Sequence, residues 1–288
     1  MSARGWLFPA LPLGRLAIFR SITYAFVVLD VLWLHTSGWW HGYADPVWYQ
    51  PLIMGELLHL PAATVTLVNA LKWATVAAAL VAMTGRLPRL AGGLVAAGWI
   101  WYQYVAFAYG KVDHDRGDFV VALLLLPTVG SAWWSDRIRS QAAGFVMRAV
   151  QLAAIATYFL SAWAKVRFGG WEWVNSATMV RAVVRRGTPW VKWLLDLPWL
   201  LQATQWGLFA AEMASPLIFA LTEKWRRRVV YAWFAFHAVT FASITIAFWP
   251  HLIILLAFLP LETYADRLRA WWRRRAVAQD SSFGARNR

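Results

Sequence analysis

Long apolar segments alternate with short polar ones along nearly the whole chain. Eight apolar segments run over about 14–35, 61–84, 90–109, 119–134, 143–166, 203–222, 229–248 and 251–263, the last being the shortest. A helix needs roughly 20 apolar residues to cross about 30 Å of hydrocarbon, and most segments have that length. The pattern therefore predicts an all-α fold: a polytopic integral membrane bundle of about eight transmembrane helices, with a range of seven to nine.

Composition supports the same class of protein. The chain has 288 residues, of which 60% are hydrophobic and only 15% are charged, and it carries 22 tryptophans. A soluble domain of this length has many more charges and far fewer tryptophans. We expect one transmembrane domain over residues 1–263 and a basic tail over 264–288. Because cysteine is absent, thiol catalysis and cysteine metal sites are excluded.

The positive charges predict how the chain is oriented. The formal net charge is +14. With both termini on one side of the membrane, 17 lysines and arginines fall in the N-terminal segment, the tail and the loops on that side. Seven fall in the loops on the other side. The positive-inside rule then predicts that both termini are cytoplasmic and that the protein spans the cell inner membrane several times. Since the membrane explains the basic charge, we expect no nucleic-acid partner.

Two segments on the predicted outer side differ from the inner loops. Residues 36–60 contain no lysine or arginine but several tryptophans and tyrosines, and residues 171–201 mix tryptophans with basic residues and two prolines. Aromatic and basic amphipathic segments of this kind lie at the membrane surface. We expect interfacial helices on the outer face, covering a cavity.

Charged residues inside apolar segments are costly, by about 2.5–3.5 kcal/mol each on insertion scales, and are candidates for function. Lys165 ends one such segment; it is either an anchor that reaches the headgroups or a neutral amine that acts as a base in a dry pocket. Glu212 is either the partner of a buried base or a helix-packing group. His237 lies in an apolar setting and is either bonded to a backbone carbonyl or functional.

Other charged residues in these segments have simpler interpretations. Arg20 and Asp30 are expected to pair with other helices, Lys72 to line a cavity or pack, and Arg148 to reach the headgroups. The polar segment GKVDHDRGDF (110–119) places His114 among aspartates, which suggests a metal site, an acid–base histidine or a solvated turn. Neighbouring loop positions rarely supply three converging ligands, so we expect no metal.

Four stretches then resemble a known family. They are LAIFRSITYAFVVLD (16–30), DHDRGDFVVALLLLP (113–127), YFLSAWAKVRFGGW (158–171) and FHAVTFASITIAFWPHLIILLAFLP (236–260). In this order they resemble the membrane domain of the vitamin K-dependent gamma-carboxylases and the broader bacterial HTTM family. The resemblance spans roughly residues 14–263.

The resemblance implies a reaction and a set of site residues. Lys165 matches the lysine that deprotonates vitamin K hydroquinone, and His114 and His237 match family histidines, so these three are the predicted catalytic residues. The cofactor would be a reduced quinone, either menaquinone or vitamin K hydroquinone. Its reaction with dioxygen yields a strong base and the quinone epoxide. We further predict that the quinone contacts the four residues Trp163, Trp171, Glu212 and Arg20.

The substrate and the role of the protein remain open. Residues 264–288 are too few to form the large extracytoplasmic domain that binds protein substrates in the carboxylases, so we expect a lipid or a small peptide as substrate. The HDR sequence after Asp113 also departs from the carboxylase loop. The alternative is a membrane factor without enzyme activity: a quinone- or lipid-binding protein, or a processing or export partner.

Overall fold

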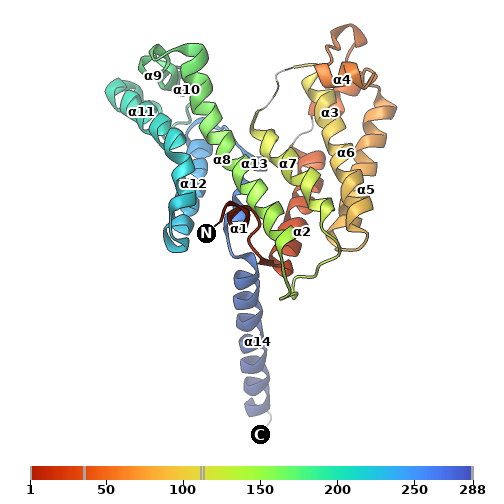
Figure 1. Ribbon diagram of the computed structural model, residues 1–288. Helices are drawn as coiled ribbons and strands as arrows, with labels where there is room; N and C mark the ends of the chain where they lie inside the picture. Colours follow the sequence, from red (N-terminus) through yellow and green to blue (C-terminus); the bar gives the residue numbers. More distant parts are fainter. Residues whose placement is uncertain (1, 35–36, 111, 113, 287–288) are drawn as a thin grey trace.

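The protein is built almost entirely of helices (Figure 1). The computed structural model describes residues 2–34, 37–110, 112 and 114–286; of residues 37, 114 and 276–286 it describes the backbone only. The single pair of strands in this part of the chain joins β1 (Leu11–Pro12) to β2 (Arg139–Ser140) in antiparallel register. The predicted all-α class is therefore confirmed.

A helix occupies each of the eight predicted apolar segments. They are α2 with the π-helical turn η1 (Leu13–Leu29, Asp30–Leu34), α5 (Val65–Met83), α6 (Pro88–Phe107), α7 with η5 (Gly117–Leu125, Leu126–Thr128), α8 (Gln141–Gly169), α11 with η7 (Pro198–Ala214, Ser215–Ala220), α12 (Glu223–Ile244) and α13 with η8 (Trp249–Leu255, Leu256–Phe258). Their ends follow local chemistry. The hydroxyl of Thr64 accepts a hydrogen bond from the Leu67 amide at the start of α5, and Gly170, with φ 64°, ends α8.

Three of the described helices are long and apolar enough to cross a membrane: Leu13–Leu34, Val65–Met83 and Gln141–Gly169. The predicted number of eight spans is therefore not confirmed by length and composition. The reasons are local. The apolar helices Gly117–Thr128 and Trp249–Phe258 are short. Helix α11 passes into a 3₁₀ turn containing Pro216, which lacks an amide hydrogen, and α12 begins with a run of basic residues.

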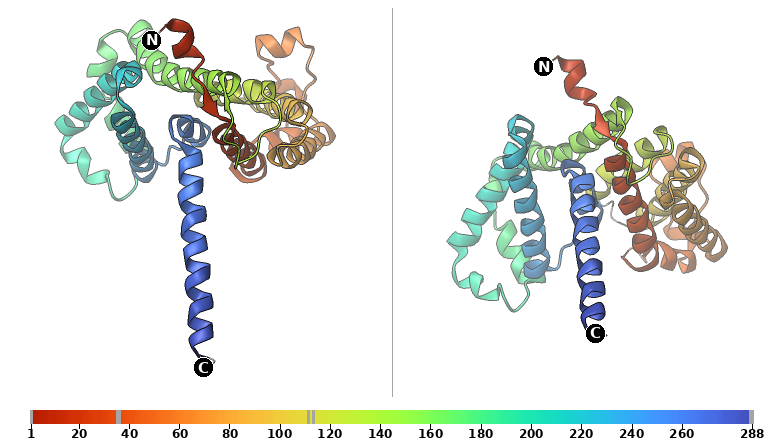
Figure 2. Two further views of the ribbon diagram at one scale, coloured as in Figure 1. Left: turned by 60° about the horizontal axis from the view of Figure 1, so that its bottom comes forward. Right: turned by 90° about the horizontal axis from the view of Figure 1, so that it is seen from below.

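The long helices form two groups beside α8. Helices α2, α5 and α6 lie on one side, and α11 and α12 lie on the other, with α7, α8 and α13 between them (Figure 1, Figure 2). The buried apolar core runs through α2, α5, α6, α7, α8 and α13. In α12 only Val230 and His237 are buried, so most of that helix is exposed to the surroundings. A polar residue at one of its two buried positions requires a partner inside the protein.

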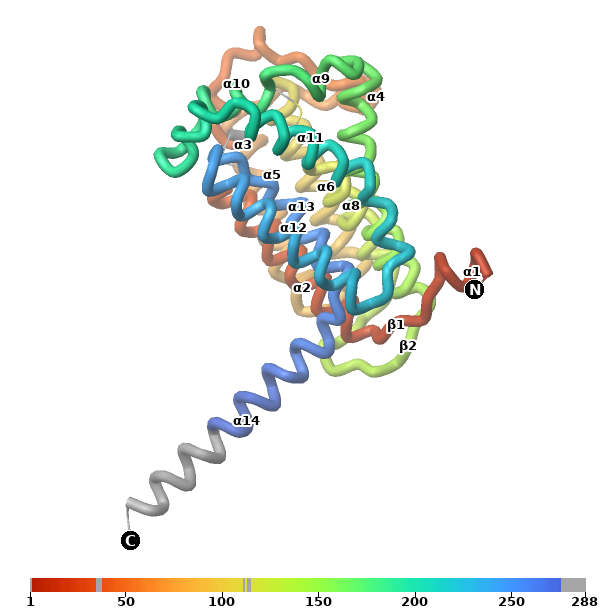
Figure 3. Tube along the Cα trace, turned by 90° about the vertical axis from the view of Figure 1, so that its left-hand side faces the viewer, coloured from red at the N-terminus to blue at the C-terminus, as the bar shows by residue number. Residues whose placement is uncertain are grey.

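Short helices fill the remaining segments. They are α1 (Ala3–Leu7), α3 (Ser37–Trp40), η2 (His41–Tyr43), η3 (Pro46–Trp48), α4 (Ile53–Leu57), η4 (His114–Arg116), α9 (Glu172–Asn175), α10 (Thr178–Arg186) and η6 (Lys192–Asp196). Helices α3, α4, α9 and α10 lie at one end of the bundle (Figure 3). The two segments expected to be interfacial thus form short helices at a common end. Helix α14 (Leu261–Arg286) projects from the opposite end.

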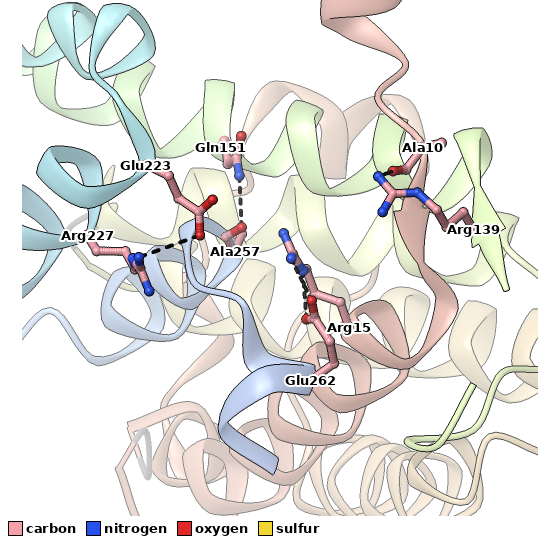
Figure 4. A network of polar contacts seen from close by, with 8 residues as sticks. All are labelled: Ala10, Arg15, Arg139, Gln151, Glu223, Arg227, Ala257 and Glu262. Atoms are coloured by element: carbon pink, nitrogen blue, oxygen red, sulfur yellow. Dashed lines mark hydrogen bonds and ion pairs between the residues drawn. The ribbon is translucent and has the colours of Figure 1, made fainter. Parts of the chain in front are cut away.

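Polar contacts join the base of α14 to the bundle (Figure 4). The Arg15 guanidinium donates two hydrogen bonds to the Glu262 carboxylate, at 2.8 and 2.6 Å, and the Gln151 amide donates to the Ala257 carbonyl at 2.8 Å. A bidentate arginine–carboxylate contact fixes direction as well as distance. These contacts set where α14 leaves the bundle.

Arg20 is fully buried on α2, at 1% exposure. Its guanidinium donates to the carbonyls of Leu126, Val129 and Gly130, at 3.2, 2.8 and 3.2 Å. These carbonyls follow the end of α7, where the helix no longer supplies partners. Arg20 therefore bonds backbone groups rather than the carboxylate on another helix that the sequence suggested.

We expect Arg20→Met to destabilise the protein by about 3 kcal/mol or more, because three buried carbonyls lose a charged donor. Thermal unfolding in detergent would measure the change. The exposed Arg89 on α6 serves as control, and R89Q is expected to stay within about 0.5 kcal/mol of the wild type. Equal melting temperatures for R20M and R89Q would contradict the assigned contacts.

Candidate functional site

Three polar residues form a stripe along α8. Gln151, Tyr158 and Lys165 are seven residues apart, close to two helical turns, and so lie on one face about 10 Å from one another along the axis. Each has its partner in a different element: Gln151 bonds the Ala257 carbonyl of η8, Tyr158 bonds His237 of α12, and Lys165 pairs with Glu212 of α11. The stripe brings two of the predicted residues, Lys165 and Glu212, into direct contact.

The Lys165–Glu212 pair lies near the end of α8. The Nζ atom of Lys165 contacts Oε2 of Glu212 and stands 5.1 Å from the centre of the Trp173 ring. The two side chains are 24% and 22% exposed, so they are shielded but not sealed. Lys165 is thus held between a carboxylate and an aromatic face, and both stabilise a positive charge.

A cavity of about 800 Å³ runs along α7 and α8 beside this pair; we call it the lysine cavity. Its walls are mostly apolar, and its polar members include Lys165 at one end and Asp118 on α7. Leu160 and Phe168 line it and are 56% and 82% exposed, so the cavity is open to the surroundings beside apolar side chains. An apolar compound could enter there.

Asp118 joins the lysine cavity to a buried histidine. Its Oδ2 atom lies 2.5 Å from Nδ1 of His251 on α13, and the two residues are each 2% exposed. An ionised carboxylate only accepts hydrogen bonds, so Nδ1 of His251 is the donor in this contact. Within the described residues Nε2 of His251 and Oδ1 of Asp118 have no hydrogen-bond partner. A carboxylate that orients a histidine in this way prepares it to accept a proton.

His237 belongs to the same buried cluster. Its Nε2 atom lies 2.7 Å from the Tyr158 hydroxyl, and its ring centre lies 5.5 Å from that of His251. Tyr158 also packs edge-on against His251, with ring centres 4.6 Å apart. His237 therefore bonds a side chain, and not a backbone carbonyl as one interpretation of the sequence required.

The other predicted residues lie outside the lysine cavity. Trp163 and Trp171 are 48% and 63% exposed, and Arg20 lines a separate cavity near Met83. The side chain of His114 lies outside the described part of the structure, so its predicted role is not tested.

The remaining charged residues of the apolar segments have structural partners. The Asp30 carboxylate accepts from Arg116 at 3.0 Å, Lys72 lies over the rings of Trp39 and Trp73, and Arg148 lies over Trp6. None of these groups lines the lysine cavity.

The sequence reasoning missed Asp118, His251 and Tyr158 as site residues. Asp118 and His251 are 133 positions apart, and each stands at the edge of an apolar segment, where a polar residue is common. A usable signal was available: His251 lies inside the matched stretch 236–260, directly after Trp249 and Pro250. For Tyr158 the signal in the sequence was weaker: it stands seven residues before Lys165.

Comparisons with protein-family models, with curated proteins and with solved structures find no match. Among the described residues no three histidine, aspartate or glutamate side chains converge as a metal ion would require. The site consists of a carboxylate–amine pair and a carboxylate–histidine pair, and one member of each, Lys165 and Asp118, lines the same apolar cavity.

A double-mutant cycle tests the Lys165–Glu212 contact. We expect Lys165→Met and Glu212→Gln each to lower the free energy of unfolding by about 1 kcal/mol or more, because each leaves a shielded charge without its partner. The double variant should cost less than the two single variants together, with a coupling of at least about 0.5 kcal/mol. Additive losses in thermal unfolding would mean that the two side chains do not interact.

Proposed function

We propose that this protein is an integral-membrane enzyme of the kind that the gamma-carboxylase membrane domain represents, using a reduced quinone and dioxygen to generate a strong base. The observation that carries the proposal is that one apolar cavity is lined by Lys165, which pairs with Glu212, and by Asp118, which contacts His251. A cavity of this kind, with a proton-accepting group beside each of these two lining residues, suits an apolar substrate that must lose a proton.

The residues of the lysine cavity fit a quinone. Its walls are apolar, its exposed side chains face a route from the lipid, and Trp173 offers an aromatic surface beside Lys165. Lys165, Glu212 and Trp173 would hold the headgroup at one end. A bound reduced quinone supplies the ring whose oxidation by dioxygen generates the strong base. Menaquinone and vitamin K hydroquinone both meet these requirements.

The pairing with Glu212 changes the role expected of Lys165. A lysine beside a carboxylate is favoured as the ammonium, so the carboxylate is the better acceptor of a hydroxyl proton. In the proposal, Oε2 of Glu212 accepts that proton, and Nζ of Lys165 remains positive to balance the negative charge left in the cavity. Nε2 of His251, oriented through Asp118, is the second proton acceptor, and the apolar walls limit the access of water.

The proposed orientation follows the charge count. With eight spans and both termini cytoplasmic in the cell inner membrane, the end of the bundle that carries α9 and α10 faces outward, and so does Lys165. The substrate would then be a lipid or a small peptide that reaches the outer leaflet.

A second candidate is a quinone- or lipid-binding membrane factor without enzyme activity, or a processing or export partner. The ion pair itself favours it, since a contact between α8 and α11 would stabilise helix packing whether or not any chemistry takes place. The two candidates differ in what Glu212 and His251 contribute to turnover.

Epoxide formation tests the proposal. Purified protein in nanodiscs, given vitamin K hydroquinone or reduced menaquinone and dioxygen, should form the quinone epoxide, measured by chromatography. We expect Lys165→Met and Glu212→Gln to abolish it. His251→Gln should slow it by at least about 100-fold, because a general base typically contributes that much.

The matched control is Lys72→Met. Lys72 also lies within an apolar helix and over tryptophan rings, but it does not line the lysine cavity. K72M should keep wild-type activity. If the wild type binds quinone but forms no epoxide, the enzyme candidate is wrong and the binding factor is favoured.

A further inference from the structure

A second cavity, distinct from the lysine cavity, lies at the end of the bundle that carries α10. It has a volume of about 730 Å³, and we call it the arginine cavity because four arginines line it: Arg116, Arg181, Arg185 and Arg186. Its two carboxylates, Asp30 and Asp115, leave an excess of two positive charges. A cleft with that excess attracts anions.

Three of these arginines are not used by the fold. Arg181, Arg185 and Arg186 are exposed, and none forms an ion pair or a side-chain hydrogen bond with the described residues. The helix dipole favours cations in the last turn of α10, which accounts for Arg185 and Arg186. It does not account for Arg181, which stands one turn earlier and repels Arg185 across four positions.

The chain holds α10 firmly over the cavity. At the start of α10 the Met179 amide donates to Oε1 of Gln205 at 2.9 Å. After its end, the amide and hydroxyl of Thr188 donate to the Ser243 and Ala242 carbonyls at the end of α12, at 2.9 and 2.8 Å. These bonds anchor the backbone of the helix near both ends, which lowers the backbone entropy lost on binding.

Another part of the lining of the arginine cavity is apolar. It includes Ile246 and Phe248, between α12 and α13, and Trp249, the first residue of α13. The lining thus combines guanidinium groups, which bind phosphate through paired hydrogen bonds, with apolar and aromatic surface. A ligand that matches both parts of the lining has a phosphate group and an apolar portion.

We propose that the arginine cavity is a binding site for the phosphate group of an amphiphilic molecule. Arg181, Arg185 and Arg186 bind the phosphate oxygens, and the segment 246–249 contacts the apolar portion. The site holds whether or not the lysine cavity is catalytic, since it shares none of that cavity's lining residues. Phe248 connects the two regions, because its ring lies 5.2 Å from that of His237.

Two probes distinguish a lipid headgroup from free phosphate. Native mass spectrometry of the full chain in detergent would count bound dioleoylphosphatidylglycerol against dioleoylphosphatidylcholine, and calorimetry would measure inorganic pyrophosphate. Preferred binding of the anionic lipid alone assigns the site to headgroups. Binding of pyrophosphate as well assigns it to the phosphate group from either source.

Three variants test the assignment to this cavity. R181Q/R185Q/R186Q should weaken binding by more than about tenfold. R273Q/R274Q/R275Q removes the same charge from exposed positions on α14 and should bind as the wild type. Ala182→Trp keeps every arginine but fills the cavity that Ala182 lines, and should also weaken binding by more than about tenfold.

Wild-type binding by A182W, or equal losses in the two triple variants, would overturn the proposal, because general surface charge would then explain the affinity. The proposal would also be overturned if the wild type bound neither the anionic lipid nor pyrophosphate. Thermal unfolding of each variant checks that it is folded. Arg181→Lys with the other two arginines intact should lose less affinity than Arg181→Gln, because the charge is kept while the paired hydrogen bonds are lost.

Discussion

The polar stripe on α8 is the constraint on which the second half of the structure depends. Gln151, Tyr158 and Lys165 each fix a different later element, namely η8, α12 and α11. In hydrocarbon there is little hydrophobic force between helices, so specific polar contacts carry more of the orientation than in a soluble bundle. The seven-residue spacing matters because it keeps all three contacts on one face of a helix of 29 residues.

Much of the fold could be predicted from the sequence because apolar length is a strong signal. Each apolar segment contains a helix, because a helix pairs its own backbone groups while its apolar side chains are buried. The number of spans was harder to predict. Pro216 in η7 and the basic residues at the start of α12 interrupt helices whose composition is otherwise apolar. The path of α14 away from the bundle depends on Arg15 and Glu262, 247 positions apart, which no local pattern relates.

Some residues of the candidate site could likewise be predicted from the sequence, and others could not. Lys165, Glu212 and His237 could be singled out because a polar group in an apolar segment is expensive and must have a partner. Their actual partners could not be named, because a pairing between helices depends on which faces meet. Asp118 and His251 are the clearest case. Each stands at the start of a helix, where polar residues raise no suspicion, and only the packing of α7 against α13 brings them together.

The distribution of charge distinguishes the two cavities. Each of the two charged residues that line the lysine cavity lies beside a partner: Lys165 beside Glu212, and Asp118 beside His251. Such a site presents little unpaired charge, which suits a neutral apolar ligand. At the arginine cavity the Asp30 carboxylate pairs with Arg116 and also accepts from Trp99 and Gln103, and the three arginines of α10 form no ion pair among the described residues. That excess of positive charge favours an anionic ligand. The segment between α12 and α13 borders the arginine cavity and also supplies Phe248, which packs on His237. A ligand that moves this segment would therefore act on the histidine cluster through packing.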